Sequence, residues 1–219
     1  MNLYFFKQTM KSISIVSFIF ILISIISCKK ENEPEIILIC EDIDGYVYDT
    51  VRIGTQVWMA ENLRSTHFNN GDTLGYKYSI GAAGRTYDFE PYGMLYSWDA
   101  IIDSRDICPK GWHIPSLEEW HILRDYLGGW KVAGGKMKET GTLHWNEPNL
   151  GADNSSGFTA LPCGNQGGGE GNWTCFGSTT EWDEINIFFA SLSYSSAEFH
   201  SLNNSRDFSY MSIRCIRDY

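Results

Sequence analysis

Cys108-Pro-Lys-Gly-Trp-His-Ile-Pro-Ser-Leu-Glu-Glu-Trp120 is the stretch that decides the fold, because it contains the clearest helix start in the chain. Ser116 and Glu119 match a capping box, in which each side chain accepts a hydrogen bond from a backbone N–H at the start of the helix. Apolar residues then recur at helical spacing up to Gly128-Gly129, where glycine favours a helix end. We therefore predict a helix over residues 116–127 with its apolar face in the core.

Shorter elements are predicted on the N-terminal side of this helix. Residues 46–53 and 56–59 are separated by Gly54-Thr55, and their β-branched and aromatic residues are typical of two strands joined by a turn. Residues 92–101 place apolar side chains three positions apart, so we predict a second, short helix there. Residues 69–88 are Gly-rich without periodicity and predict a long surface loop.

Turns dominate the C-terminal side of the predicted helix. Beyond Lys138 glycine and proline recur, which predicts a loop region of roughly 40 residues, and such long loops usually carry function. Residues 186–194 and 208–217 alternate in polarity and predict strands. In the last strand, period-2 alternation places Arg214 on the same face as Tyr210, opposite Cys215.

The first residues predict where the protein works. Lys7 and Lys11 precede an apolar run over residues 13–26 that stops just before Cys28, and the run is shorter than the roughly 20 residues of a bilayer span. The pattern resembles a bacterial lipoprotein signal. We therefore predict a signal peptide over residues 1–27, and a lipidated Cys28 that begins a flexible tether over residues 28–41.

The tether also predicts on which side of the outer membrane the protein lies. Acidic residues follow the cysteine closely, and this resembles the surface-export signal of Bacteroidetes lipoproteins. We expect an outer-membrane lipoprotein that is exposed at the cell surface, with a periplasm-facing placement as the alternative.

The charge balance excludes one class of partner. The chain has 17 basic and 27 acidic residues, and removal of residues 1–27 takes away Lys7 and Lys11, so the mature net charge is 15 − 27 = −12. Phosphate binding needs a basic patch, so nucleic acid is not expected as a partner. The remaining length suits one domain, which we place at residues 42–219.

Cysteine usage predicts disulfides in an oxidising compartment. Six cysteines less Cys28 leave five, and none of these has the spacing of a zinc or redox motif. Five cysteines allow up to 15 arrangements of two pairs, which sequence spacing alone does not resolve. We favour pairing Cys108 with Cys215 and Cys163 with Cys175, which leaves Cys40 unpaired near the tether.

Several motifs resemble a known family. The chain is similar to the Fibrobacter succinogenes major paralogous domain over residues 42–218, and that family is common in secreted and lipid-anchored proteins. The motifs are Val57-Trp-Met-Ala-Glu-Asn-Leu63, Tyr92-Gly-Met-Leu-Tyr-Ser-Trp98, the stretch from Cys108 to Trp120, Asn154-Ser-Ser-Gly-Phe-Thr-Ala-Leu-Pro162 and Ser212-Ile-Arg-Cys-Ile-Arg-Asp218.

A weaker resemblance concerns the fold. The stretch from Gly111 to Trp120 and the terminal Ser-Ile-Arg-Cys-Ile-Arg are similar in order to signatures of formylglycine-generating-enzyme-like proteins. This resemblance implies an α+β, C-type-lectin-like fold, with small antiparallel sheets, two flanking helices and a long loop region. A bridge from an early cysteine to one in the last strand fits that fold.

No catalytic, metal or cofactor site is inferred. Glu147-Pro148-Asn149 matches the calcium tripeptide of sugar-binding C-type lectins, but the second ligand strand of those lectins is missing. An oxidase of the formylglycine-generating type needs two close reactive cysteines, and the interval between Cys163 and Cys175 does not match that family's tighter motif. The histidines are scattered, and we expect His113 to be a hydrogen-bonded core residue.

Aromatic rings beside amide side chains are the remaining candidates for function. A ring stacks on apolar C–H surface while an amide both donates and accepts hydrogen bonds, so this combination suits a glycan or peptide. The alternative for Trp145 is a place in the core. We expect a surface binding or adhesion module, with envelope assembly through a partner protein as the alternative and an oxidase third. The candidate ligand residues are Trp145, Asn146, Asn149, Asn165, Gln166, Trp173 and Trp182.

Overall fold

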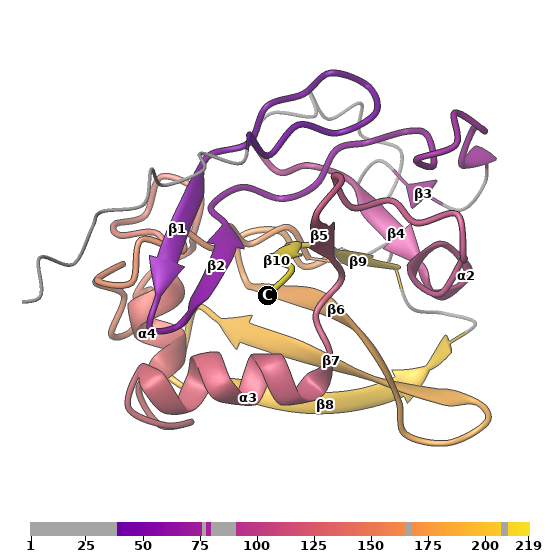
Figure 1. Ribbon diagram of the computed structural model, residues 1–219. Helices are drawn as coiled ribbons and strands as arrows, with labels where there is room; N and C mark the ends of the chain where they lie inside the picture. The colour runs from indigo at the N-terminus through magenta and orange to yellow at the C-terminus, as the bar shows by residue number, and fades with distance from the viewer. Residues whose placement is uncertain (1–38, 76–77, 80–90, 165–167, 207–209) are drawn as a thin grey trace, which may run out of the picture. The chain divides into compact units, whose positions relative to one another are not determined.

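The structure is a computed structural model that describes residues 39–75, 78–79, 91–164, 168–206 and 210–219 (Figure 1). Residues 39–219 form one compact unit. The predicted signal peptide and Cys28 lie outside the described residues. Cys40, which we assigned to the tether, is buried in the main core, so the folded part begins earlier than residue 42.

Two sheets hold most of the fold together, and their strands come from both ends of the chain (Figure 1). The four-stranded sheet is antiparallel and has the order β1-β2-β10-β5, with β1 Thr50–Ile53, β2 Gln56–Met59, β10 Ile216–Arg217 and β5 Trp112–His113. The six-stranded sheet has the order β3-β4-β9-β6-β7-β8, with β3 Tyr78–Ser79, β4 Leu95–Ser97, β9 Tyr210–Ser212, β6 Trp173–Glu181, β7 Asn186–Ser193 and β8 His200–Ser205.

The pairing within the larger sheet is mixed. Its strands pair antiparallel except β6 and β9, which run parallel where Phe176 lies beside Ser212. Three short helices complete the described elements: α2 Trp98–Ile101, α3 Leu117–Tyr126 and α4 Ala133–Met137. The fold is therefore a mixed α and β architecture dominated by antiparallel and mixed sheets.

The predicted central helix is confirmed as α3. The Ser116 side chain accepts a hydrogen bond from the Glu119 backbone N–H at 3.3 Å, and the Glu119 carboxylate accepts the Ser116 backbone N–H at 2.8 Å. The helix packs against β6 and β7 (Figure 1). The Trp120 ring lies 4.7 Å from that of Trp58 and donates its indole N–H to the Gly177 carbonyl at 3.1 Å. Its buried polar atom is thereby satisfied.

The predicted hairpin is also confirmed, with Gly54 at φ +63 between β1 and β2.

The other predicted elements need correction. The predicted helix over residues 92–101 is wrong in its first half, because Leu95 to Ser97 pair with β9 and only Trp98–Ile101 are helical. The last predicted strand is divided into β9 and β10 by residues 213–215. Part of the predicted loop over residues 69–88 lies outside the described residues, and β3 falls within it.

The long loop region is shorter than predicted. β6 begins at Trp173, and β8 follows β7, so two strands were missed. The β6 sequence Trp-Thr-Cys-Phe-Gly-Ser-Thr-Thr-Glu lacks a clear polar and apolar alternation, because both of its faces are covered over much of its length. A strand with two buried faces shows no period-2 signal.

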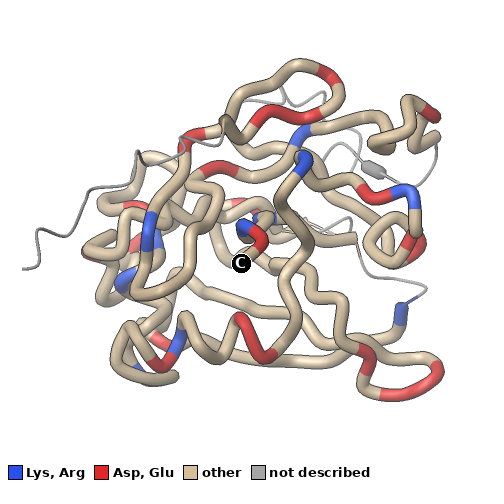
Figure 2. Tube along the Cα trace, in the orientation of Figure 1, with Lys and Arg blue, Asp and Glu red and all other residues tan. Residues whose placement is uncertain are grey.

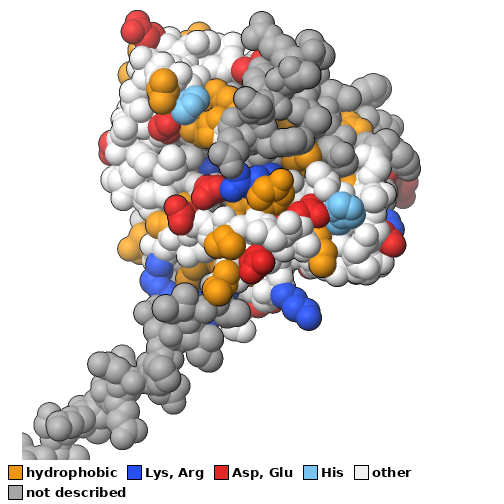
Figure 3. Space-filling model, turned by 90° about the horizontal axis from the view of Figure 1, so that it is seen from above, with side chains coloured by type: hydrophobic (Ala, Val, Ile, Leu, Met, Phe, Trp, Pro, Cys, Tyr) orange, Lys and Arg blue, Asp and Glu red, His pale blue; other side chains and the backbone are white. Residues whose placement is uncertain are grey.

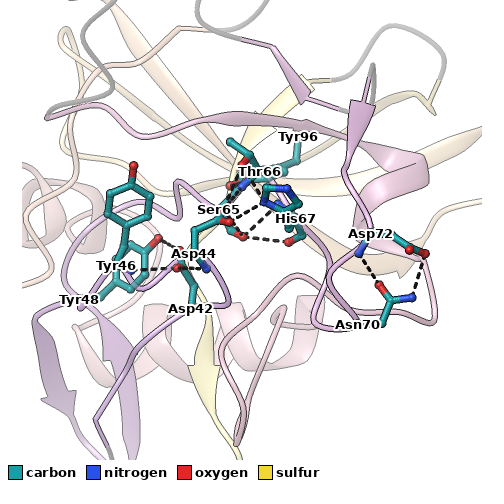
Figure 4. Close-up of polar contacts among 10 residues, drawn as sticks. All are labelled: Asp42, Asp44, Tyr46, Tyr48, Ser65, Thr66, His67, Asn70, Asp72 and Tyr96. Carbon is teal, nitrogen blue, oxygen red and sulfur yellow. Dashed lines mark hydrogen bonds and ion pairs between the residues drawn. The ribbon is translucent and has the colours of Figure 1, made fainter.

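The Asp42 carboxylate holds the first turn, and the Asp44 carboxylate ties this turn to the loop after β2 (Figure 4). The Asp42 carboxylate accepts backbone N–H groups of Asp44 and Tyr46, each at 3.0 Å, and the Tyr48 hydroxyl. The Asp44 carboxylate accepts the Thr66 backbone N–H at 2.6 Å and contacts His67 Nδ1 at 2.5 Å. Both acids are therefore structural.

Among the described helices, none is long and apolar enough to cross a membrane.

Candidate functional site

Three of the cysteine predictions can be compared with the structure. Cys108 and Cys215 form the predicted disulfide, with a Cα–Cα distance of 5.9 Å, and it joins the segment before β5 to the segment before β10. The second predicted pair is wrong, because Cys163 and Cys175 are free and buried. Cys40 is also free and buried, as expected for the unpaired residue.

The two free thiols have different surroundings. Cys163 packs in a small cluster with Leu95 and Leu161, and its sulfur accepts a hydrogen bond from the Asn62 amide at 3.1 Å. Cys175 belongs to the main core and lines a cavity beside Trp173. Burial raises the pKa of the Cys175 thiol to about 12 and also raises the pKa of the Cys163 thiol. Both thiols are therefore protonated and unreactive at neutral pH.

Two of the candidate ligand residues are part of the interior. Trp145 is 1% exposed and donates its indole N–H to the Ala160 carbonyl at 2.9 Å, so it is a core residue. Asn149 is buried, and its side-chain amide nitrogen donates to the Glu139 and Gly141 carbonyls at 2.9 and 2.7 Å. That amide holds the loop together, and it is not presented to a ligand.

The other candidates are scattered. Asn146 is exposed and donates from its side chain to the Asn172 side-chain oxygen at 3.0 Å. Trp182 is 58% exposed at the β6–β7 turn, where its ring meets Phe188 edge to face at 5.1 Å. Asn165 and Gln166 lie outside the described residues. The candidates that the structure describes are therefore not gathered into one platform.

Trp173 is the candidate that lies in a cavity. It is partly buried at the start of β6, and it lines a cavity of about 270 Å³ on one face of the six-stranded sheet, which we name the aromatic pocket. Strand pairing brings β7 beside β6, with Cys175 opposite Ser191, so their side chains share this face. The aromatic pocket is lined by Trp173, Cys175, Phe189, Ser191, Leu202, Asn204, Tyr210 and Met211.

The lining of the aromatic pocket is apolar with a few polar groups. Three aromatic rings form part of it, and Leu202 is 45% exposed at its edge strand. The Asn204 side-chain oxygen accepts the Ser205 backbone N–H at 2.8 Å, and its amide nitrogen has no hydrogen-bond partner within the described residues. Aromatic rings with a small number of placed polar groups are typical of ligand pockets.

A second cavity of about 410 Å³ lies where four loop segments meet, and we name it the charged pocket. The loop after β2 contributes Glu61 and Arg64, and it runs through the upper part of Figure 1. Figure 3 shows the molecule from above, and acidic, basic and histidine side chains lie on that face. The charged pocket is lined by Ala60, Glu61, Asn62, Arg64, Pro91, Gly93, Glu139, His144, Thr159, Leu161 and Arg214. None of these residues was among the predicted ligand contacts.

Two ion pairs form part of this lining. Arg64 contacts the Glu61 carboxylate at 3.1 Å, and its guanidinium lies over the Tyr46 ring at 4.9 Å. His144 Nδ1 contacts the Glu139 carboxylate at 2.8 Å. The basic and acidic residues are also interspersed along the trace of the whole described chain (Figure 2). No three His, Cys, Asp or Glu side chains converge as a metal site in the part that the structure describes.

His113 has a structural setting that differs from the predicted one. It lies in β5 with its side chain 36% exposed, and its ring contacts Glu119 at 2.8 Å through Nε2 and Asp218 at 2.6 Å through Nδ1. The two carboxylates raise the pKa of His113 to about 9, with Glu119 the larger cause. His113 is hydrogen-bonded as predicted, but it lies at the surface.

Comparison with known proteins identifies the family and adds no relative of known activity. None of the curated proteins and none of the solved structures matches the chain significantly. The model of the Fibrobacter succinogenes major domain matches residues 51–217, which include α3, every lining residue of the two pockets and both sheets except Thr50. With this match over most of its length, the chain belongs to the Fibrobacter succinogenes major domain family.

Proposed function

We propose that the protein is a lipid-anchored binding module of the cell surface that recognises glycans through the aromatic pocket. The observation that carries the proposal is the position of Trp173, whose ring lines a cavity together with Phe189 and Tyr210. Sugar rings present C–H faces to aromatic rings and hydroxyls to amides. The amide nitrogen of Asn204, which is exposed and has no partner among the described residues, supplies such a donor at the same cavity.

The finer fold assignment is also a proposal. A C-type-lectin-like fold is supported by the order of the elements, with strands, short helices, loops and then strands, and by the disulfide from Cys108 to Cys215. In that fold the loop region carries ligands. In this chain the aromatic pocket draws its residues from paired strands, so we place the site on the sheet face.

The anchor belongs to the same proposal. We infer attachment at Cys28 from the apolar run that precedes it and from the charged segment that follows. Metabolic labelling with a clickable fatty acid should mark the protein in its host and should fail with Cys28→Ser. Labelling that persists in the variant would exclude Cys28 as the attachment site.

Binding is tested on a glycan array with the chain from residue 28 that carries Cys28→Ser. Trp173→Ala should weaken binding about tenfold or more, because it removes an aromatic anchor from the pocket. Trp182→Ala is the matched control, since that tryptophan is exposed and does not line the aromatic pocket. Equal loss in both variants, or no bound glycan, would contradict the proposal and favour a protein partner in envelope assembly.

Calcium provides an independent arm of this experiment. The side-chain oxygen of Asn149, which is the atom that would coordinate calcium, is buried, and the amide nitrogen is held by backbone carbonyls, so we expect the same binding with calcium and with a chelator. Binding that requires calcium would move the site from the aromatic pocket to Glu147 and Asn149.

A further inference from the structure

The charged pocket contains a buried cation that contacts no negative group among the residues that the structure describes. Arg214 is 1% exposed and lies between β9 and β10. Its Nε donates to the Asn62 side-chain oxygen at 2.5 Å, and Nη1 donates to the Met59 and Phe158 carbonyls at 3.2 and 2.5 Å. Nη2 donates to the Thr159 carbonyl at 3.0 Å. All four acceptors are neutral oxygens.

The groups around Arg214 leave its charge without a direct counterion in the described part of the chain. The Cys163 thiol lies nearby, but burial raises its pKa, so it is uncharged at neutral pH. Glu61 acts on Arg214 at longer range, while its carboxylate contacts Arg64. A buried charge is costly unless an opposite charge or a set of hydrogen bonds offsets it. Here the four hydrogen bonds do so together with two aromatic rings, because the guanidinium lies over Phe158 at 4.6 Å and over Phe176 at 5.7 Å.

Arg214 also retains binding capacity toward the cavity. A guanidinium carries five N–H donors, and the four hydrogen bonds above leave one N–H on Nη2 without a partner among the described residues. Arg214 is one of the residues that line the charged pocket. The other charged residues of the lining are in pairs, Arg64 with Glu61 and His144 with Glu139. Within the described residues, Arg214 is therefore the charged side chain of this lining that takes part in no ion pair.

We propose that the charged pocket binds a small molecule through a carboxylate group, which contacts Arg214. Hydrogen bonds between an arginine and a carboxylate are about twice as strong as neutral ones, and they are stronger still away from water. A volume of about 410 Å³ suits a ligand of the size of a monosaccharide or an amino acid. This site differs from the aromatic pocket, so it goes beyond the proposed glycan function.

Isothermal titration calorimetry tests the proposal by measuring the binding of three matched small molecules. The protein is the chain from residue 28 with Cys28→Ser. Galacturonate and glutamate both carry a carboxylate, and galactose has the sugar ring without it. We expect one or both acids to bind and galactose not to bind at this site. Binding of galacturonate alone would assign an acidic sugar, and binding of glutamate alone would assign an amino acid. Equal binding of galactose and galacturonate, or no binding of either acid, would overturn the proposal.

Two variants locate the site. Ala60→Phe fills the charged pocket from a partly exposed position and should weaken binding of the acid about tenfold or more. Arg214→Lys keeps the charge and loses the planar fork, so it should also weaken binding. Ala60→Phe keeps the test valid if Arg214→Lys does not fold. Unchanged affinity in a folded Ala60→Phe variant would refute the location.

The glycan proposal and the carboxylate proposal can fail separately. Trp173→Ala should leave the binding of the acid unchanged, because Trp173 does not line the charged pocket. Loss of acid binding in Trp173→Ala would place the acid in the aromatic pocket and would overturn the present assignment.

Discussion

Replacing Lys138 by methionine should destabilise the fold by about 3 kcal/mol, although it removes a charge from the interior. Lys138 is 0% exposed, and its ammonium donates to the carbonyls of Leu150, Ser193 and Ser196 at 3.0, 2.9 and 2.9 Å. The ammonium also lies 5.3 Å from the centre of the Trp145 ring. One side chain therefore ties the end of α4 to the loop before β6 and to the turn after β7.

The magnitude follows from two opposing terms. A hydrogen bond from a charged donor contributes about 1.5 to 3 kcal/mol, so the three bonds together contribute about 4.5 to 9 kcal/mol. Desolvation opposes them and lowers the pKa of Lys138 from 10.5 to about 8. That shift corresponds to roughly 3 kcal/mol against the charged form. The difference is a few kcal/mol, on the order of the 3 kcal/mol given above.

Urea unfolding followed by tryptophan fluorescence measures the loss. Lys136→Met is the matched control, because Lys136 lies on the same helix, is partly exposed and makes no side-chain hydrogen bond within the described residues. It should change the free energy of unfolding by less than about 0.5 kcal/mol. Equal stability of the two variants would refute the role that we assign to Lys138.

The same pair of proteins gives a pH test with a definite sign. Between pH 8 and 10.5 the folded protein loses the Lys138 proton while the unfolded chain retains it. Stability rises with pH wherever the unfolded state binds more protons. The stability advantage of the natural protein over Lys138→Met should therefore widen above pH 8. A difference that stays constant from pH 7 to 10 would show that the amine is not desolvated in the folded state.

Three further outcomes are expected. Cys108→Ser removes the disulfide with Cys215, which spans 107 residues, and chain entropy predicts a loss of about 4 to 5 kcal/mol in the free energy of unfolding. Urea unfolding measures this loss, and a value below about 1 kcal/mol would contradict the prediction. Glu119→Ala should cost about 1 kcal/mol because it opens the capping box, and Glu118→Ala, on the same turn, should be close to neutral. Glu119 and Asp218 raise the pKa of His113 to about 9, so the stability that His113 contributes is full below pH 6.5 and is lost as the pH rises through 9. The free energy of unfolding of the natural protein should therefore exceed that of His113→Gln by more at pH 6 than at pH 10.

Local signals allowed part of the fold to be predicted. The capping box and the following helical spacing predicted α3, and the Gly54-Thr55 turn predicted the hairpin of β1 and β2. Both elements are decided by residues close in sequence. The predicted helix over residues 92–101 was wrong at Leu95 because pairing with β9, more than 100 residues later, overrides the local spacing.

The buried polar residues were beyond such signals. Lys138 and Arg214 are fully buried cations, and their N–H groups donate hydrogen bonds to backbone carbonyls of distant segments. Charged residues are almost never fully buried unless they have such partners. A basic residue in the middle of an apolar strand, as in Ser212-Ile-Arg-Cys-Ile-Arg217, was the one available sign for Arg214. For Lys138, no comparable sign exists in its neighbours.

The tryptophans show why a site is harder to predict than an element. Trp145, Trp173 and Trp182 all stand among small and polar residues, and this context made each a candidate ligand residue, with a place in the core as the alternative for Trp145. The structure gives them different places, because Trp145 is covered by Lys138 and the loop that it ties, whereas Trp182 lies at a hairpin turn. Trp173 lines a cavity only because β6 pairs with β7 in the register that sets Cys175 opposite Ser191. Register is a long-range property, and it decides which side chains share a face. Trp173→Ala and Trp182→Ala should therefore be compared on one glycan array. Loss of binding in Trp173→Ala alone would show that the position set by strand register decides binding, and that exposure of a tryptophan at the surface does not.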